Sequence, residues 1–290
     1  MRYDPARSRL EHVMGDAIRL LAREDIEDAR RNVEWMLCEL LGVGRASLYA
    51  YPERILTAGE TEALTRMLER RAGHEPLQHI LGHTEFMGLR IAVSPDVLIP
   101  RHETELLVEY GLADIEGKEA PRVLDIGTGS GCIPIALKHR RPDARVFACD
   151  ISEPALRIAR ENGAVAQTPI VWHRLDILAD TLDEGAGAPF DLILSNPPYI
   201  PMEDGDSLQA EVSAFEPHLA LFPGEDPLVF YRAIAGKARP ALRPGGSVIV
   251  EIYSDFADQV SACFAEAGFT RIRVLDDLAG RARFVHVRTP

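Results

Sequence analysis

The stretch LSNPPYI at residues 194–200 ends an apolar, strand-like run with groups that could bind an NH2 group. Pro197 and Pro198 fix φ and lack an N–H, and each biases the residue before it towards an extended conformation. The side-chain oxygen of Asn196 and the Pro197 carbonyl can both accept hydrogen bonds from one NH2 group, and Tyr199 can stack on a planar group. The stretch predicts a site for an adenine, a cytosine or a carboxamide. Taken alone, it could also be a rigid turn that ends a strand.

A second group that could do chemistry is the glycine loop DIGTGSG at residues 125–131. It follows one expected strand and precedes a helix, and its glycines can take positive φ and let a ligand approach the backbone closely. Asp150 ends the next strand, 19 residues beyond Gly131, where its carboxylate can accept hydrogen bonds from both hydroxyls of a ribose. These features predict a bound adenosine, with a tight turn plus an exposed aspartate as the alternative. The expected cofactor-binding residues of the loop are Asp125, Gly127, Thr128, Gly129, Ser130 and Gly131.

S-adenosylmethionine is the adenosine compound that fits this loop best. The dinucleotide pattern G-x-G-x-x-G needs a glycine at position 132, where this chain has Cys132, and no phosphate loop of the form G-x-x-x-x-G-K-[ST] occurs. S-adenosylmethionine has no pyrophosphate, and Asp125 suits its ammonium group and its positive charge. With this methyl donor, Asn196 and the Pro197 carbonyl become the expected catalytic groups, because they orient a nitrogen lone pair towards the methyl. Such nitrogens are poor nucleophiles, and alignment can supply up to ~7–11 kcal/mol.

Alternating strand and helix patterns from residue 122 onward would bring these groups to one edge of a sheet. Strands separated by helices predict an α/β fold with a doubly wound, mostly parallel seven-stranded sheet, and the short link between the last two strands predicts antiparallel pairing. Asn196 would lie at the carboxyl edge, where ligands of open α/β sheets bind. The expected strands are 122–127, 146–150, 170–174, 191–196, 247–252, 270–275 and 284–288, with helices around 132–140, 153–163, 226–239 and 254–267.

The first third of the chain has a helical pattern. Apolar residues share one face from Leu10 to Leu21 and again from Val33 to Leu41. Thr57 and Glu60 form a T-x-x-E capping box that starts a third helix. The sequence therefore predicts a small helical domain before the sheet.

Residues 84–100, TEFMGLRIAVSPDVLIP, are typical of two short strands, with Ser94-Pro95-Asp96 as their turn. The following RHETELLVEYGLAD predicts a helix that leads into the second half of the chain. The expected organisation is a helical domain at 1–83, a β-hairpin linker at 84–105 and an α/β domain at 106–290.

Composition narrows the class of function. The 290 residues are 46% hydrophobic and 27% charged, which is ordinary for globular proteins, and the length suits two domains. The net charge of −13 gives no electrostatic attraction to phosphate backbones or anionic membranes. The four scattered cysteines fit free thiols, the N-terminus has no apolar signal core, and no run reaches the roughly 18 apolar residues of a membrane span. We expect a cytoplasmic monomer that holds no metal.

In their order and spacing, DIGTGSG, Asp150, SNPPYI and VLIPRHETELLVE resemble the N5-glutamine methyltransferases, most closely the peptide chain release factor type (HemK/PrmC). The resemblance covers nearly the whole chain and extends to EPLQHILGHTEFMGL, FEPHLALFPGEDPLVFYR and GGSVIVEI. N-P-P-Y alone is shared with adenine-N6 methyltransferases. The I-P-R-x-E-T-E segment, together with the helical N-terminus, is what singles out the glutamine enzymes.

The resemblance implies a class I methyltransferase fold that binds S-adenosylmethionine over the glycine loop. It also implies a substrate, namely the side-chain amide of the glutamine in the Gly-Gly-Gln motif of class 1 release factors. The loop glycines and Asp150 carry over as cofactor contacts, and Asp176 near the third strand's end is expected at the adenine edge. The amide-binding residues that carry over are Asn196, Pro197, Pro198 and Tyr199, and Asn196 would also face the cofactor.

Four further positions are less closely defined by the resemblance. Arg101 and Glu103 match the family pattern and are assigned to organising the substrate site, with a surface ion pair at a helix start as the alternative. His102 stands where the family usually has proline, which affects the shape of this loop. Glu251 either faces the pocket from the fifth strand or caps a sheet edge.

Three other functions stay open at this point. The nearest is a glutamine methyltransferase of a ribosomal protein, against which the 84–105 segment argues. An adenine-N6 methyltransferase of nucleic acid needs a basic surface that flips bases, and the charge of −13 with no basic run argues against it. A cofactor-sensing protein with a dead site would be favoured by a change at Asn196, but N-P-P-Y is intact.

Overall fold

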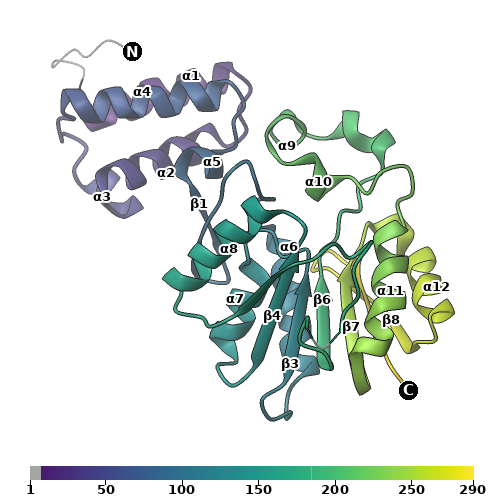
Figure 1. Ribbon diagram of the computed structural model, residues 1–290. Helices are drawn as coiled ribbons and strands as arrows, with labels where there is room; N and C mark the ends of the chain where they lie inside the picture. Colours follow the sequence, from purple (N-terminus) through teal and green to yellow (C-terminus); the bar gives the residue numbers. More distant parts are fainter. Residues whose placement is uncertain (1–7, 184) are drawn as a thin grey trace. The chain divides into compact units, whose positions relative to one another are not determined.

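The computed structural model describes residues 8–183 and 185–290 of the chain (Figure 1). The chain divides into two compact units. The first comprises the residues up to Gly82 together with Gln209–Phe215, and the second comprises His83–Leu208 together with Glu216–Pro290.

The first unit is helical, as its apolar periodicity predicts. The Thr57 hydroxyl accepts from the Glu60 N–H at 3.2 Å, and Glu60 Oε2 accepts from the Thr57 N–H at 2.7 Å, which confirms the capping box. The short α3 and α5 are not predicted, because five or six residues carry too little periodicity. The helices of this unit are α1 (Leu10–Arg23), α2 (Ala29–Leu41), α3 (Arg45–Ala50), α4 (Ala58–Ala72), α5 (Leu77–Leu81) and α9 (Ala210–Phe215).

The buried cation Arg71 in α4 explains why the distant segment Gln209–Phe215 belongs to this unit. Its Nε donates to Asn32 Oδ1 in α2 at 2.8 Å, and its Nη1 donates to the Glu75 carbonyl at 3.1 Å. Its Nη2 lies 2.9 Å from Glu211 Oε2 in α9. A buried charge must be paired, so this ion pair holds α9 against the helices of the first unit.

The second unit begins with a hairpin, β1 (His83–Phe86) and β2 (Leu89–Ala92), whose turn differs from the predicted one. Phe86 pairs with Leu89, so Met87 and Gly88 form a two-residue turn with φ of 49° and 78°, as a tight type I′ turn requires. The predicted residues Ser94-Pro95-Asp96 do form a turn, in which the Val97 N–H donates to the Ser94 carbonyl at 3.1 Å, but this turn follows β2. The prediction that they join the two strands is therefore wrong.

A seven-stranded sheet forms the centre of the second unit, in the order β5-β4-β3-β6-β7-β9-β8. The first five of these are parallel, and β9 pairs antiparallel with both β7 and β8, so both sheet predictions are confirmed. The strands are β3 (Arg122–Ile126), β4 (Arg145–Asp150), β5 (Val171–Arg174), β6 (Phe190–Ser195), β7 (Leu242–Glu251), β8 (Thr270–Asp276) and β9 (Ala282–Arg288).

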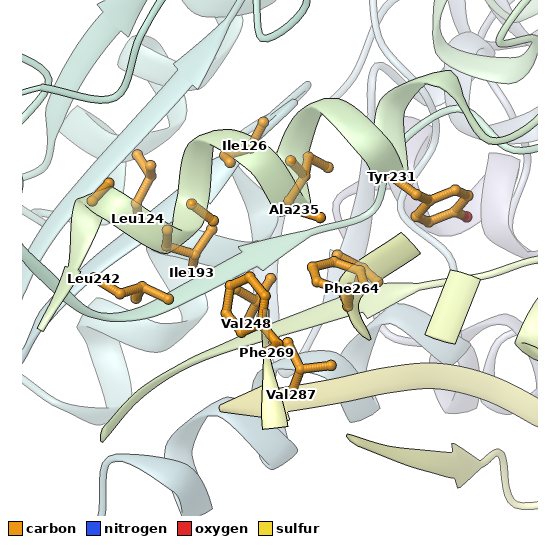
Figure 2. Close-up of a cluster of buried hydrophobic side chains, with 14 of the residues drawn as sticks. Leu124, Ile126, Ile193, Tyr231, Ala235, Leu242, Val248, Phe264, Phe269 and Val287 are labelled. Carbon is orange, nitrogen blue, oxygen red and sulfur yellow. The ribbon is translucent and has the colours of Figure 1, made fainter. Parts of the chain in front are cut away.

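Helices cover both faces of this sheet, as a doubly wound fold requires. Side chains alternate along β3, so Leu124 packs on the face that carries α11 and α12, and Val123 packs on the face that carries α6 and α7. Figure 2 shows the first of these clusters, in which Tyr231 and Ala235 of α11 lie over the strands. The helical segments are α6 (His102–Asp114), α7 (Cys132–Arg140), α8 (Glu153–Val165), η2 (Met202–Ser207), α10 (His218–Leu221), α11 (Val229–Ala241), η3 (Ser254–Phe256) and α12 (Ala257–Glu266).

Candidate active site

A cavity of about 230 Å³ lies at the carboxyl ends of β3, β4 and β6. The strand order reverses here, because the chain runs outwards from β3 to β5 and returns on the other side of β3 to form β6. Most of the site residues predicted from sequence line this cavity: Arg101, Gly127, Thr128, Gly129, Ser130, Asp150, Asp176, Asn196, Pro197 and Pro198. The others, Glu103, Asp125, Gly131 and Tyr199, lie outside its wall.

Backbone hydrogen bonds fix the glycine loop against the end of β4. The N–H groups of Gly127 and Thr128 both donate to the Cys149 carbonyl, at 2.9 and 3.0 Å. The Gly131 N–H donates to the Thr128 carbonyl at 2.8 Å. From α8, Asn162 Nδ2 donates to the Ser130 carbonyl at 2.9 Å. The loop conformation is therefore set by the protein itself, before any ligand contributes.

Asp150 has one hydrogen-bond partner on each of its carboxylate oxygens. Its Oδ2 accepts from the Gly129 N–H and its Oδ1 accepts from the Ser152 N–H, both at 2.9 Å. Burial raises the pKa of Asp150, while these N–H groups favour its ionised form. A carboxylate has about four acceptor positions, so two remain for hydroxyl donors such as those of a ribose.

Asp125 lies beneath the loop as a buried acid, 1% exposed. Within residues 8–183 and 185–290, no donor reaches either carboxylate oxygen with good hydrogen-bond geometry, and the Thr128 hydroxyl of the loop is its nearby polar partner. Burial is the main cause that raises the pKa of Asp125 to about 7, with the Thr128 hydroxyl opposing the rise and the charge of Asp150 adding to it. A buried carboxylate close to a cavity favours a cationic ligand, but Asp125 is not part of the wall, so its role at the cofactor stays a prediction.

We expect Asp125→Asn to flatten the pH dependence of stability between about pH 4 and 7. The pKa of Asp125 rises from 3.8 to about 7 on folding, so the folded chain binds this proton more tightly than the unfolded chain. The stability from this group is therefore full at low pH and lost as pH rises through that window. Urea unfolding of both proteins at pH 5 and pH 8 measures the difference. If the free energy of unfolding drops equally from pH 5 to pH 8 in the wild type and in Asp125→Asn, this role is contradicted.

We expect Gly131→Ala to destabilise the second unit more than Gly129→Ala does. A Cβ at Gly131, where φ is 81°, would lie 3.0 Å from Ala159 Cβ and 3.1 Å from Trp172 Cη2. At Gly129, where φ is 54°, no heavy atom of the described chain lies within 4 Å of such a Cβ. Backbone strain alone costs about 1–2 kcal/mol and overpacking adds about 1–3 kcal/mol. Urea unfolding at pH 7 tests the order, and equal losses would show that the contacts of Gly131 relax freely.

The end of β6 holds Asn196 in a defined orientation. The Ser195 hydroxyl donates to the Ile126 carbonyl at 2.8 Å, which joins the ends of β6 and β3. Asn196 Nδ2 donates to Thr104 Oγ1 of α6 at 3.2 Å. This bond directs the amino group of Asn196 towards α6 and leaves the amide oxygen as the acceptor for a substrate.

Glu251 supports the same side chains from β7. It is 1% exposed; its Oε2 accepts from the Thr104 hydroxyl at 2.8 Å, and its Oε1 accepts from the Tyr199 hydroxyl at 3.1 Å. Burial, with the charge of Glu251 next, raises the pKa of Tyr199, so its hydroxyl keeps its proton and donates. Of the two alternatives from sequence, Glu251 neither lines the cavity nor caps an exposed edge.

Arg101 joins the two segments that border the cavity at residues 96–101 and 217–220. Its Nη2 donates to Glu216 Oε1 at 2.6 Å, and Glu216 Oε2 accepts from the Ile99 N–H at 3.2 Å. Glu216 is the buried partner of this ion pair. Glu103 and His102 are exposed on α6, so the structure does not bring Glu103 together with Arg101 at the cavity.

Asp176 borders the cavity close to two apolar side chains, Ile151 and Leu178, that are more than one third exposed. Asp176 Oδ1 accepts from the Leu178 N–H at 2.8 Å, which leaves Oδ2 for a donor such as an exocyclic NH2. A flat aromatic ring that covered Ile151 and Leu178 would remove this apolar surface from water.

Sequence reasoning did not identify Thr104, Asn162 or Glu216 as site residues. Thr104 falls on the buried face of α6, with Leu107, Val108 and Gly111 at helical spacing. A hydroxyl on an otherwise apolar helix face can therefore be recognised in the sequence as a candidate buried polar contact. The buried Asn162 and Glu216 act through tertiary contacts that no local pattern reveals.

Within the part of the chain that the structure describes, no helix has both the length and the apolar character needed to cross a bilayer.

Comparison with known proteins identifies the family. A family model described as "PrmC N-terminal domain" matches residues 12–82, and one described as "Methyltransferase small domain" matches residues 103–213. Among solved structures, a methyltransferase from Pyrococcus furiosus matches with a TM-score of 0.51 and 16% identity over 79% of this chain and 98% of that chain, which supports the methyltransferase fold.

Curated relatives named "Release factor glutamine methyltransferase" match most of the sequence. The protein from Bacteroides thetaiotaomicron is 41% identical over 249 residues, which are 86% of this chain and 88% of the relative. The protein from Koribacter versatilis is 38% identical over 281 residues, which are 97% of this chain and 99% of the relative. With these matches over both units, and with a class I methyltransferase fold around the cavity, the chain belongs to the release factor glutamine methyltransferase family.

Proposed function

We propose that this protein transfers the methyl group of S-adenosylmethionine to the side-chain amide nitrogen (N5) of the glutamine in the Gly-Gly-Gln motif of class 1 peptide chain release factors. The observation that carries the proposal is the bond from Asn196 Nδ2 to Thr104, because it turns the amide oxygen of Asn196 towards a substrate NH2. The Pro197 carbonyl follows directly in the chain and serves as the second acceptor. The names of the relatives support the choice of substrate.

The residues around the cavity fit S-adenosylmethionine. Asp150 has acceptor capacity for the two ribose hydroxyls, and Asp176 with Ile151 and Leu178 suits an adenine ring. The buried carboxylate of Asp125 favours the positive charge of this compound over an anionic nucleotide. When bound, S-adenosylmethionine supplies an electrophilic methyl group.

The chain contributes to the reaction mainly by alignment. Asn196 Oδ1 and the Pro197 carbonyl accept the two N–H groups of the substrate amide, which holds its nitrogen in line with the methyl carbon. With S-adenosylmethionine bound, the amide nitrogen held by these two acceptors would take the methyl group, and the electron pair of the broken C–S bond would stay on sulfur. The nitrogen then releases one proton to water. Pro198 lines the cavity next to these acceptors, and Tyr199 lies behind the wall with its hydroxyl bonded to Glu251.

Recognition of the protein substrate is assigned to the helical domain predicted at residues 1–83, with Arg101 organising the mouth of the cavity. The net charge of −13 disfavours nucleic acid as the substrate. The four cysteines are free thiols, in agreement with a reducing compartment, and we place the reaction in the cytoplasm and take the enzyme to be a monomer.

A methyl-transfer assay with labelled S-adenosylmethionine tests the proposal. The purified protein receives a whole release factor in one reaction and its Gln→Ala variant in another. Label on the wild-type factor alone, located by mass spectrometry on the Gly-Gly-Gln glutamine, supports substrate and atom together. No label on either factor, with cofactor binding intact, would overturn the substrate, and ribosomal proteins and then nucleic acid would be tested next.

A further inference from the structure

A chain of hydrogen bonds links Asn196 to a buried acid that does not touch the cavity. Asn196 Nδ2 donates to Thr104 Oγ1 at 3.2 Å, and the Thr104 hydroxyl donates to Glu251 Oε2 at 2.8 Å. The second oxygen of Glu251 accepts from the Tyr199 hydroxyl at 3.1 Å. Glu251 is the final acceptor of this chain, so the direction of each hydrogen bond depends on whether Glu251 accepts or donates.

The number of protons fixes that direction. A threonine hydroxyl carries one hydrogen, and Thr104 Oγ1 can accept from Asn196 while it donates its own hydrogen to Glu251. An ionised Glu251 has two acceptor oxygens and satisfies both Thr104 and Tyr199. A protonated Glu251 must donate through one oxygen, and if that oxygen faces Thr104, the Thr104 hydrogen turns towards Asn196. The Asn196 amide then flips and presents its NH2 to the cavity.

We propose that Glu251, as a carboxylate, is the positioning residue that keeps the Asn196 oxygen directed at the substrate NH2 and holds the Tyr199 hydroxyl in place. This inference rests on the proposed function, since it concerns how that substrate amide is held. Glu251 acts through Thr104 and Tyr199, and its strand end is fixed in turn because the Tyr231 hydroxyl donates to the Glu251 carbonyl at 3.0 Å.

The surroundings of Glu251 allow its charge to change near neutral pH. Burial raises the pKa of Glu251 to about 7, although the hydrogen bonds from Thr104 and Tyr199 and the charge of Arg283 on β9 oppose the rise. The negative charge of Glu103 on α6 is a smaller contribution to the same rise. The ionised form that orients Asn196 is therefore lost as the pH falls below about 7.

The first experiment measures kcat at saturating S-adenosylmethionine and release factor between pH 5.5 and 8.5. We expect kcat of the wild type to fall at low pH with an apparent pKa of about 7. Glu251→Gln should lower kcat about 10- to 100-fold at pH 8 and remove this ionisation, because one acceptor is replaced by a donor. If kcat of Glu251→Gln falls with the same apparent pKa near 7 as kcat of the wild type, the proposal is overturned.

Two matched variants of Thr104 test the same chain of hydrogen bonds even if Glu251→Gln disturbs the fold. Thr104→Ser keeps the hydroxyl and should stay within about 3-fold of the wild type, while Thr104→Val keeps the shape and should lose about 10- to 100-fold. The double variant Thr104→Val with Glu251→Gln should be no slower than the worse single variant, because both break one chain. Additive losses would show two separate roles and contradict the proposal.

A control and a readout free of substrate separate positioning from stability and from function. Ser247→Ala removes another buried hydrogen bond on β7, to Asp114, and should lower stability while leaving the pH profile unchanged. The side-chain 15N resonance of Asn196, assigned with Asn196→Asp, should titrate near pH 7 in the free wild type and not in Glu251→Gln. If no release factor is methylated, the proposed function fails, yet this titration still decides the positioning role. A resonance that titrates equally in both proteins would overturn it.

Discussion

Replacing Asn196 by alanine is expected to lower the turnover of glutamine methylation by about 10³-fold, because it removes one of the two acceptors that orient the amide nitrogen. The nitrogen lone pair is delocalised, so the reaction depends on alignment more than on proton removal. The measurement is single-turnover transfer of labelled methyl to a release factor, with saturating enzyme. Cofactor affinity, measured by calorimetry, should change by less than about 10-fold, because Asn196 is one of many residues that line the cavity.

Asn196→Asp is the matched variant for this prediction. It keeps the acceptor oxygen and the shape of the side chain, but a second oxygen replaces the NH2 group and cannot donate to Thr104, whose own hydrogen is committed to Glu251. We expect turnover between those of the wild type and of Asn196→Ala. Turnover of Asn196→Ala within about 10-fold of the wild type would show that Asn196 does not hold the amide, and the N-P-P-Y stretch would then be a structural turn.

Replacing Asp150 by alanine is expected to weaken S-adenosylmethionine binding by about 10²- to 10³-fold. Hydrogen bonds to a charged group contribute about 1.5–3 kcal/mol each, and the carboxylate has room for two from a ribose. The variant also releases the Gly129 and Ser152 N–H groups and loosens the glycine loop. Asp150→Asn keeps the shape and one acceptor, so its loss should be about 10-fold. Calorimetric titration of the free enzyme gives these affinities directly.

Comparing S-adenosylmethionine with S-adenosylhomocysteine separates the two acids. Both compounds carry the same ribose, so Asp150→Ala should weaken both equally. Only S-adenosylmethionine carries the sulfonium charge, so Asp125→Asn should weaken it more than S-adenosylhomocysteine. A loss in Asp150→Ala that is confined to S-adenosylmethionine would place Asp150 near the sulfonium rather than the ribose.

The sheet can be predicted from sequence mainly because the strands β3, β4, β6 and β7 hold buried apolar runs between turn residues. The edge strands β5 and β8 are only partly buried, yet all seven strands overlap their predicted positions. The hairpin turn is misread for a physical reason. Ser-Pro-Asp is a strong turn sequence, whereas methionine rarely takes the positive φ of 49° that it has at Met87. The fixed register of β1 and β2 imposes this conformation, and composition gives no sign of it.

The candidate site also has a part that local sequence predicts and a part that it does not. The glycine loop, Asp150 and N-P-P-Y are contiguous motifs at strand ends, so their place at the cavity follows from the parallel sheet alone. The contacts that orient them are long-range: Glu216 joins Arg101 across 115 residues, and Asn162 joins the hairpin across 70. Glu103 and Arg101 belong to the same sequence motif, but Glu103 lies on the exposed side of α6.

The bond between Thr104 and Glu251 spans 147 residues of chain, and this separation orders events during protein synthesis. The ribosome adds about 5–20 residues per second, so the acceptor for Thr104 is made roughly 7–30 s after Thr104 itself. The glycine loop and Asp150 are complete well before that, with β3 and β4 already made. A nascent chain can therefore form its nucleoside-binding half while Asn196 still lacks a fixed orientation, and methylating ability arises only when β7 joins the sheet.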